Sequence, residues 1–385
     1  MRTRREAAFY RPELDILRFC AFLGVYAVHA VSIPQRTLTD HHIPTLIGEA
    51  MTSLVRAGSY GVDLFFVLSA YLITELLERE KAATRTISLK SFYIRRILRI
   101  WPLYYFFLAL AAAVPFLNPG REFSSPQVLL FAVFLGNWSF YFLGWAGYVA
   151  IPLWSLSVEE QFYLFWPPLM KRLPRRGLIA VAIGLIVIAN LSRYLALWRH
   201  DGTRHIWTST FAHLDSIGAG VLVSMWLKGR TPNLHVATRI AMLLAAVAAF
   251  AVRGHSVGLE PADRLYPWET IIQYPLVVVA CAATLVAFLG MPVRAPALVY
   301  LGRISYGLYV YHLTCIFITD RLLRGDPGIL HASLRIVVSL GMTIAISAFS
   351  YAFLEKPFLR IKRRFTIIES RPDGAAASLP LQPVT

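Results

Sequence analysis

The chain has 385 residues, of which 57% are hydrophobic and only 16% are charged. Its mean hydropathy of +0.55 means that apolar runs fill most of the length, which excludes an ordinary soluble protein and indicates a polytopic membrane protein. The formal charge of +16 comes from Lys and Arg clusters between apolar runs, so it indicates positive-inside topology rather than nucleic-acid binding.

The first predicted helix covers Leu14 to Val31 and reads LDILRFCAFLGVYAVHAV, about 27 Å of helix. Asp15, Arg18 and His29 interrupt this apolar run, and each charge inside a membrane costs at least about 2.5–3.5 kcal/mol. The spacing from Arg18 to His29 nearly restores the helical register, so both lie on one face, roughly 16 Å apart. We expect a polar stripe that faces the inside of a bundle, with Asp15 and Arg18 near one membrane surface and His29 near the other.

Further apolar runs of spanning length follow along the chain, with an ambiguous stretch at 126–170. Two full crossings in that stretch would place the basic cluster 171–176 outside, against the positive-inside tendency. We therefore predict an all-α membrane protein with about ten transmembrane helices and a re-entrant or interfacial segment within 126–153. The runs lie at 14–33, 58–77, 97–117, 177–198, 209–227, 237–252, 270–290, 297–319 and 333–354.

This topology places both termini in the cytoplasm, together with the basic segments 78–99, 171–176 and 356–364. Residues 1–365 are expected to form the membrane-embedded domain. Residues 366–385, rich in Pro and Ala, are expected to be a disordered cytoplasmic tail.

No metal site is predicted. Cys20, Cys281 and Cys315 all lie in apolar runs without a CxxC pair, which gives neither a disulfide framework nor a zinc site. His200, Asp201 and His205 are polar enough to bind a metal, but their irregular spacing favours a solvated loop.

The segment SFYIRRILRIWPLYY places Arg95 and Arg99 four residues apart on one helical face, with Arg96 beside them. Two interpretations stay open. These arginines are ordinary topology anchors, or they form an anion site with Arg18 for the phosphates of a coenzyme A thioester, which guanidinium groups can bind bidentately.

The segment PLWSLSVEEQFYLFWPPL carries two adjacent carboxylates in an aromatic, apolar setting. Helical spacing aligns Ser155, Glu159 and Tyr163 on one strip, whereas Glu160 shares a strip with leucines. Glu159 is therefore the better candidate for the bundle interior, and an interfacial Glu in an aromatic belt is the alternative.

Two more intramembrane groups are candidates. Asp215, among small residues in LDSIGAG, pairs either with Arg18 or with local polar groups. In LGRISYGLYVYHL, Tyr309 and His312 lie on one polar helical face. A histidine in such a position is more commonly a hydrogen-bonded core residue, and catalysis by His312 is the alternative.

Several of these motifs together resemble the bacterial membrane-bound acyltransferase family 3, whose members O-acylate lipopolysaccharide O-antigens, exopolysaccharides, Nod factors and macrolides. The matching segments are RPELDILRFCAFLGVYAVHA, GVDLFFVLSAYLIT, FYIRRILRIWPLYY, LWSLSVEEQFYLFWP, LDSIGAG, GRISYGLYVYH and FLEKPF.

The resemblance implies that Arg18 and His29 are functional, that Glu159 is the acid of its motif, and that acetyl-CoA is the acyl donor. It implies no permanently bound cofactor. Two positions depart from the family pattern: Ala70 stands where Gly is usual, and His213 where Arg is common.

We therefore expect an O-acyltransferase of the bacterial inner membrane that moves an acyl group, most simply acetyl, from cytoplasmic acyl-CoA to a carbohydrate hydroxyl. His29 is the expected base, because an alcohol needs a base with a pKa near 7, and Glu159 is expected to orient it. Direct attack and an acylated intermediate both fit. The alternative from another class is a glycan or glycolipid transporter or flippase without acyl-transfer chemistry.

Overall fold

Every regular element among the described residues is helical, which confirms the predicted all-α class. The computed structural model describes residues 10–31, 44–117, 123–144, 147–199, 203–256, 269–325 and 328–368. The longer helices are α1 (Pro12–Ala30), α3 (Thr45–Ala57), α4 (Gly61–Thr84), α5 (Leu89–Leu117), α8 (Leu153–Arg172), α9 (Arg175–Trp198), α11 (Leu214–Leu227), α12 (Val236–Ser256), α13 (Tyr274–Phe288), α15 (Ser305–Leu322) and α16 (Ile329–Ser350).

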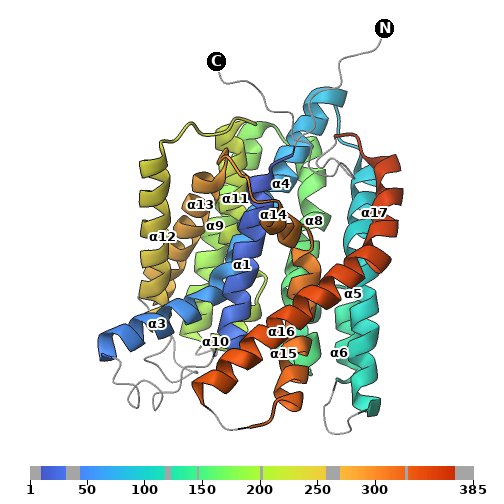
Figure 1. Cartoon of the computed structure of the whole chain (residues 1–385). Helices are drawn as coiled ribbons and strands as arrows, with labels where there is room; N and C mark the ends of the chain where they lie inside the picture. The colour runs from blue at the N-terminus through green and yellow to red at the C-terminus, as the bar shows by residue number, and fades with distance from the viewer. Residues whose placement is uncertain are drawn as a thin grey trace.

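Shorter helices connect or cap these elements. They are α6 (Ser125–Ala132), α7 (Gly136–Leu143), α10 (Thr203–Thr208), α14 (Pro296–Arg303) and α17 (Lys356–Lys362). Short turns of 3₁₀ or π helix are η1 (Gly58–Tyr60), η2 (Tyr148–Ala150), η3 (Phe211–His213), η4 (Glu269–Gln273), η5 (Tyr351–Glu355) and η6 (Arg363–Phe365). Figure 1 shows α12 along one edge of the bundle, α1 near the middle, α5 and α17 towards the other edge, and α16 running obliquely across α15.

Six helical stretches within the described residues are long and apolar enough to cross a membrane. They are Thr45–Thr84, Leu89–Ala113, Arg175–Trp198, Val236–His255, Ile271–Phe288 and Ile329–Phe365. In Val236–His255 only 17% of the most apolar window is buried, as expected for side chains that contact lipid. The chain is thus a multi-pass membrane protein, and the count of ten crossings stays a prediction.

Hydrogen bonds bring several helix termini together at one end of the bundle. They join the start of α1 to the end of α13, the end of α4 to the ends of α8 and α11, and the start of α5 to η6. The contacts are Gly290 N–H to Glu13 (3.1 Å), Lys81 to the Met170 carbonyl (2.8 Å), Arg79 to the Gly229 carbonyl (3.2 Å) and Arg95 to the Phe365 carbonyl (2.8 Å). The basic segments, which were predicted to share the cytoplasmic side of the membrane, therefore lie at the same end of the helix bundle. We call it the basic end.

The predicted re-entrant region forms α6 and α7 instead of a full span. Each has eight residues, about 12 Å of helix, which is too short to cross a bilayer. Their connection passes through Phe134, whose φ of 57° is left-handed, and the Phe134 carbonyl accepts a bond from Gln161 of α8. The segment is thus held against the bundle without crossing it.

Close helix packing depends on glycine at two places that matter below. A Cβ added to Gly302 of α14 would lie 1.8 Å from the Asp15 carbonyl oxygen of α1, so only glycine lets these segments meet. A Cβ added to Gly220 of α11 would lie 2.9 Å from the Cβ of Ala70 in α4. Ala70, the departure from the family pattern, is therefore accommodated by the glycine opposite.

The predicted tail can be followed only at its start. The last described residues are Thr366 to Ile368, and residues 369–385 lie outside the described part of the chain.

Candidate functional site

A cavity of about 170 Å³ lies where α1, α4, α5, α8 and α15 meet. At the basic end it is lined by Tyr10, Arg11 and Lys362, which we call its mouth. Deeper in the bundle it is lined by Ser155, Ser305 and Tyr309, which we call its floor. Positive charges outnumber negative ones along its wall: the cations are Arg11, Arg18, Arg96, Arg99 and Lys362, and the carboxylates are Asp15 and Glu159.

The first turns of α1 build one wall of this cavity. The three-residue spacing brings the Arg18 guanidinium 2.9 Å from the Asp15 carboxylate, as the sequence predicts. The Tyr10 hydroxyl, before the helix begins, donates to the other Asp15 oxygen at 3.1 Å. Burial, and next the Asp15 charge, raise the pKa of Tyr10, so its hydroxyl stays protonated and keeps donating.

Glu159 is held in the cavity wall from both sides. The Ser69 hydroxyl of α4 donates to one carboxylate oxygen at 2.8 Å, and the Tyr163 hydroxyl donates to the other at 3.0 Å. Arg96 lies over the Tyr163 ring, 5.3 Å from its centroid. The predicted strip of Ser155, Glu159 and Tyr163 does face the cavity.

The floor leads to a buried histidine. The hydroxyls of Ser155 and Tyr309 share a hydrogen bond of 2.8 Å. One turn further along α15, His312 Nδ1 bonds to the Tyr309 carbonyl at 2.6 Å, and its side chain is buried. Tyr309 therefore touches both the cavity and His312.

His29 lies beside His312, with 5.2 Å between the ring centroids. His29 Nδ1 bonds to the Val25 carbonyl at 2.7 Å. A carbonyl oxygen only accepts, so Nδ1 carries the hydrogen in both rings, and each neutral imidazole has its lone pair on Nε2. His29 is exposed, whereas His312 Nε2 is buried and bonds to no described residue.

Residues 11–352 match the family described as "Acyltransferase domain". The chain belongs to this acyltransferase family. The match confirms the resemblance seen in the motifs, and it covers every residue of the cavity except Tyr10 and Lys362.

Curated relatives of this chain carry related names. It is 26% identical to the peptidoglycan O-acetyltransferase OatA of Listeria monocytogenes, over 92% of this chain and 57% of the relative. It is 27% identical to YrhL of Bacillus subtilis, provisionally named a peptidoglycan O-acetyltransferase, over 90% of this chain and 55% of that protein. A Staphylococcus aureus protein provisionally named an O-acetyltransferase is also 27% identical, with 92% and 58% covered. The chain thus spans little more than half the length of these relatives.

No solved structure was found to match this chain.

Two predicted contacts of this chain are not present among the described residues. Arg95 does not line the cavity: it donates to Glu80 and to the Phe365 carbonyl, both at 2.8 Å. Arg96 and Arg99, three residues apart, share the cavity face instead. Glu159 does not orient His29, because its oxygens accept from α4 and α8 while His29 packs against His312 of α15.

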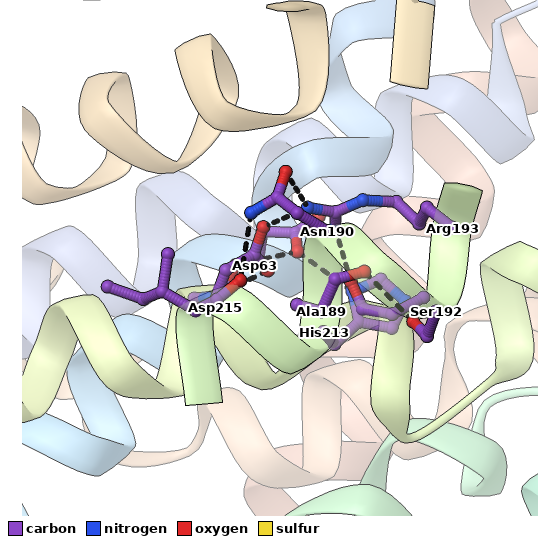
Figure 2. A network of polar contacts seen from close by, with 10 residues as sticks. Asp63, Ala189, Asn190, Ser192, Arg193, His213 and Asp215 are labelled. Carbon is purple, nitrogen blue, oxygen red and sulfur yellow. Dashed lines mark hydrogen bonds and ion pairs between the residues drawn. The ribbon is translucent and has the colours of Figure 1, made fainter. Parts of the chain in front are cut away.

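A second polar cluster lies outside the cavity. Asp215 pairs with Arg193 of α9 and not with Arg18, so its ion partner is neither of the two expected from the sequence. His213 bonds to Asp63 of α4 at 2.9 Å through Nδ1 and to the Trp207 carbonyl at 2.8 Å through Nε2. Figure 2 shows these side chains converging; we call Asp63, Arg193, His213 and Asp215 the buried ion network.

The buried ion network is neutral as a whole. Because a carboxylate and a carbonyl both accept, both ring nitrogens of His213 donate and the ring is positively charged. The network thus holds two cations and two anions, with side-chain exposures between 1% and 7%. Sequence reasoning missed Asp63, Arg193 and Ser69, although a charge inside an apolar run was the available signal for the first two.

No group of three or more His, Cys, Asp or Glu side chains is placed to hold a metal ion among the described residues. His200 and Asp201, and the side chain of His205, lie outside what the structure describes.

Proposed function

We propose that this chain is an integral-membrane O-acyltransferase that moves an acetyl group from acetyl-CoA to a hydroxyl of a carbohydrate. One observation carries the proposal: a cationic cavity ends at Tyr309, and Tyr309 in turn contacts His312, the neighbour of His29. A site for an anionic donor and a pair of bases thus meet at one side chain.

The donor end of the proposal rests on the cavity charges. Coenzyme A carries its negative charge on phosphates, and guanidinium groups bind phosphates with paired hydrogen bonds. Arg18, Arg96 and Arg99 line the cavity between mouth and floor. In this arrangement the phosphates lie toward the basic end, and the acyl-pantetheine arm extends toward Ser155 and Tyr309.

The acceptor end rests on the histidines. His29 Nε2 takes the proton of the acceptor hydroxyl, whose oxygen attacks the thioester carbonyl carbon. The carbon–sulfur bond breaks, and the coenzyme A thiolate leaves and takes up a proton. The same base serves transfer through an acylated intermediate, since that route also ends with attack by the acceptor hydroxyl.

Glu159 contributes by fixing charge in the donor site. Its carboxylate accepts hydrogen bonds from Ser69 and Tyr163. The carboxylate also interacts electrostatically with Arg18 and Arg96. We propose that it holds these guanidinium groups at the cavity wall while the donor binds.

The relatives named as peptidoglycan O-acetyltransferases support a glycan as acceptor. We propose that residues 1–365 form the membrane domain in the bacterial inner membrane, with residues 366–385 in the cytoplasm. The basic segments at one end of the bundle support cytoplasmic termini. Reporter fusions after residues 176 and 364 should both report cytoplasm, and a periplasmic signal at 176 would contradict this orientation.

The test uses full-length protein in lipid nanodiscs with labelled acetyl-CoA. The parent should hydrolyse or transfer the acetyl group, whereas a transporter or flippase would do neither. His29→Ala should abolish transfer, at least about a hundredfold, and still bind acetyl-CoA, because His29 does not line the cavity.

The matched control is His235→Ala, which alters an exposed histidine at the start of α12 and should retain both binding and transfer. Folded His29→Ala protein that transfers at the parental rate would overturn the role of His29. His312 would then be the next candidate base.

A further inference from the structure

We propose that Lys362 of α17 is a further donor-binding residue, which contacts the phosphates of acyl-CoA at the mouth of the cavity. This inference rests on the proposed function, since it concerns the same donor. It assigns a binding role to a segment that lies beyond residue 352, where the family match ends.

The position of Lys362 is the first observation. It is the last residue of α17 and lines the same cavity as Arg18 and Arg99, although it is more than 250 residues away from them in the chain. It comes from the basic end, where a donor from the cytoplasm would enter. A lysine ammonium meets a phosphate as a compact point charge, which suits phosphates that remain near solvent.

The attachment of the segment is the second observation. Directly after α17, the Phe365 carbonyl of η6 accepts a 2.8 Å hydrogen bond from Arg95. Arg95 is itself held by Glu80, whose other oxygen accepts from the Ser88 N–H at 2.8 Å. The segment that carries Lys362 is thus fastened to α4 and α5, and Arg95 acts as a positioning residue for Lys362.

Lys362 differs in position from the other charged residues of α17. Lys356 and Arg360 are exposed and do not line the cavity. Phe358 and Ile361 are also exposed, at 36% and 45%, which is typical of a helix lying at a membrane surface. Lys362 is partly buried and turns inward, so attraction to lipid headgroups does not account for its position.

The experiment compares two thioesters on full-length protein in phosphatidylcholine nanodiscs. Acetyl-CoA carries phosphates, whereas S-acetylpantetheine has the same reacting group without them. Lys362→Ala should weaken acetyl-CoA binding roughly tenfold and leave the reaction with S-acetylpantetheine unchanged. Arg360→Ala, on the same helix but outside the cavity, should change neither.

Arg95 gives a second measurement. If it acts by positioning Lys362, Arg95→Ala should weaken acetyl-CoA binding, and the double variant with Lys362→Ala should bind no more weakly than Lys362→Ala alone. Full additivity of the two losses would overturn this positioning role.

The outcomes separate the two proposals. A parent protein that binds no acetyl-CoA overturns the proposed function itself. A parent that binds it, with Lys362→Ala binding equally well, overturns only the inference about Lys362. An equal loss with both thioesters also overturns it, because that result indicates a structural role.

Discussion

The cavity and the buried ion network both place charged side chains inside a membrane bundle, yet they differ in balance and access. In the network, two cations face two anions, and each is nearly inaccessible. The cavity lining contains five cations and two carboxylates, and Arg11 also pairs with Glu13 at 3.9 Å. The mouth carries Arg11 and Lys362. Buried charges in equal number suit a structural contact between helices, whereas a cavity lined mainly by cations suits the binding of an anion.

The energetics differ in the same way. A buried ion that loses its partner is destabilising by several kcal/mol, because its desolvation is no longer offset. A cation-rich lining gives the cavity a positive potential, which attracts an anionic ligand. Substitutions in the buried ion network should therefore lower stability and leave acetyl-CoA binding unchanged. Substitutions in the cavity should weaken acetyl-CoA binding and leave stability unchanged.

The largest effect is expected in the network. Arg193→Met leaves Asp215 without its ion partner and should destabilise the protein by about 3–5 kcal/mol. Thermal unfolding in detergent and the yield of folded protein measure this. The fraction that remains folded should bind acetyl-CoA with parental affinity, because Arg193 does not line the cavity.

Two controls accompany this variant. Arg199→Met, at the exposed end of the same helix, should leave stability unchanged. Combining Arg193→Met with Asp215→Asn should recover part of the loss, since both charges are then removed. Arg193→Met protein as stable as the parent would contradict the structural role of the network.

A smaller effect is expected from Arg96→Met in the cavity. The methionine retains packing against the rings of Phe92 and Tyr163 but loses the charge. Acetyl-CoA binding, measured by calorimetry, should weaken about tenfold, the loss of roughly 1.4 kcal/mol of charge-assisted contact. The unfolding temperature should not fall, and Arg172→Met, at the exposed end of α8, should change neither quantity.

A fall in stability as large as that of Arg193→Met would show that Arg96 belongs with the structural charges. It would remove the distinction between the two regions.

Ionic strength should give the smallest effect. Raising salt from about 50 mM to about 500 mM shortens the Debye length severalfold and should weaken acetyl-CoA binding severalfold, because the cavity is reached from solvent. The buried ion network is screened much less, so the unfolding temperature should change little. Equal salt sensitivity of binding and unfolding would contradict the assignment of the network as sealed.

Within single helices, the sequence by itself determined the arrangement well. The pairing of Asp15 with Arg18, and the common face of Ser155, Glu159 and Tyr163, follow from about 3.6 residues per turn. Spacing within one helix is fixed by covalent geometry, so no knowledge of neighbours is needed. The all-α class, the lack of a full span in 126–153 and the family follow equally from local patterns and motifs.

Only the tertiary structure decided which helix faces which. Arg193 and Asp215 are 22 residues apart on two helices, and their pairing depends on how α9 and α11 are rotated against each other. The same holds for Arg95, which reaches η6 rather than the cavity, and for His29, which meets His312 rather than Glu159. Such contacts depend on the packing of whole helices, to which distant residues such as Gly302 and Gly220 contribute, and no spacing within one segment contains that information.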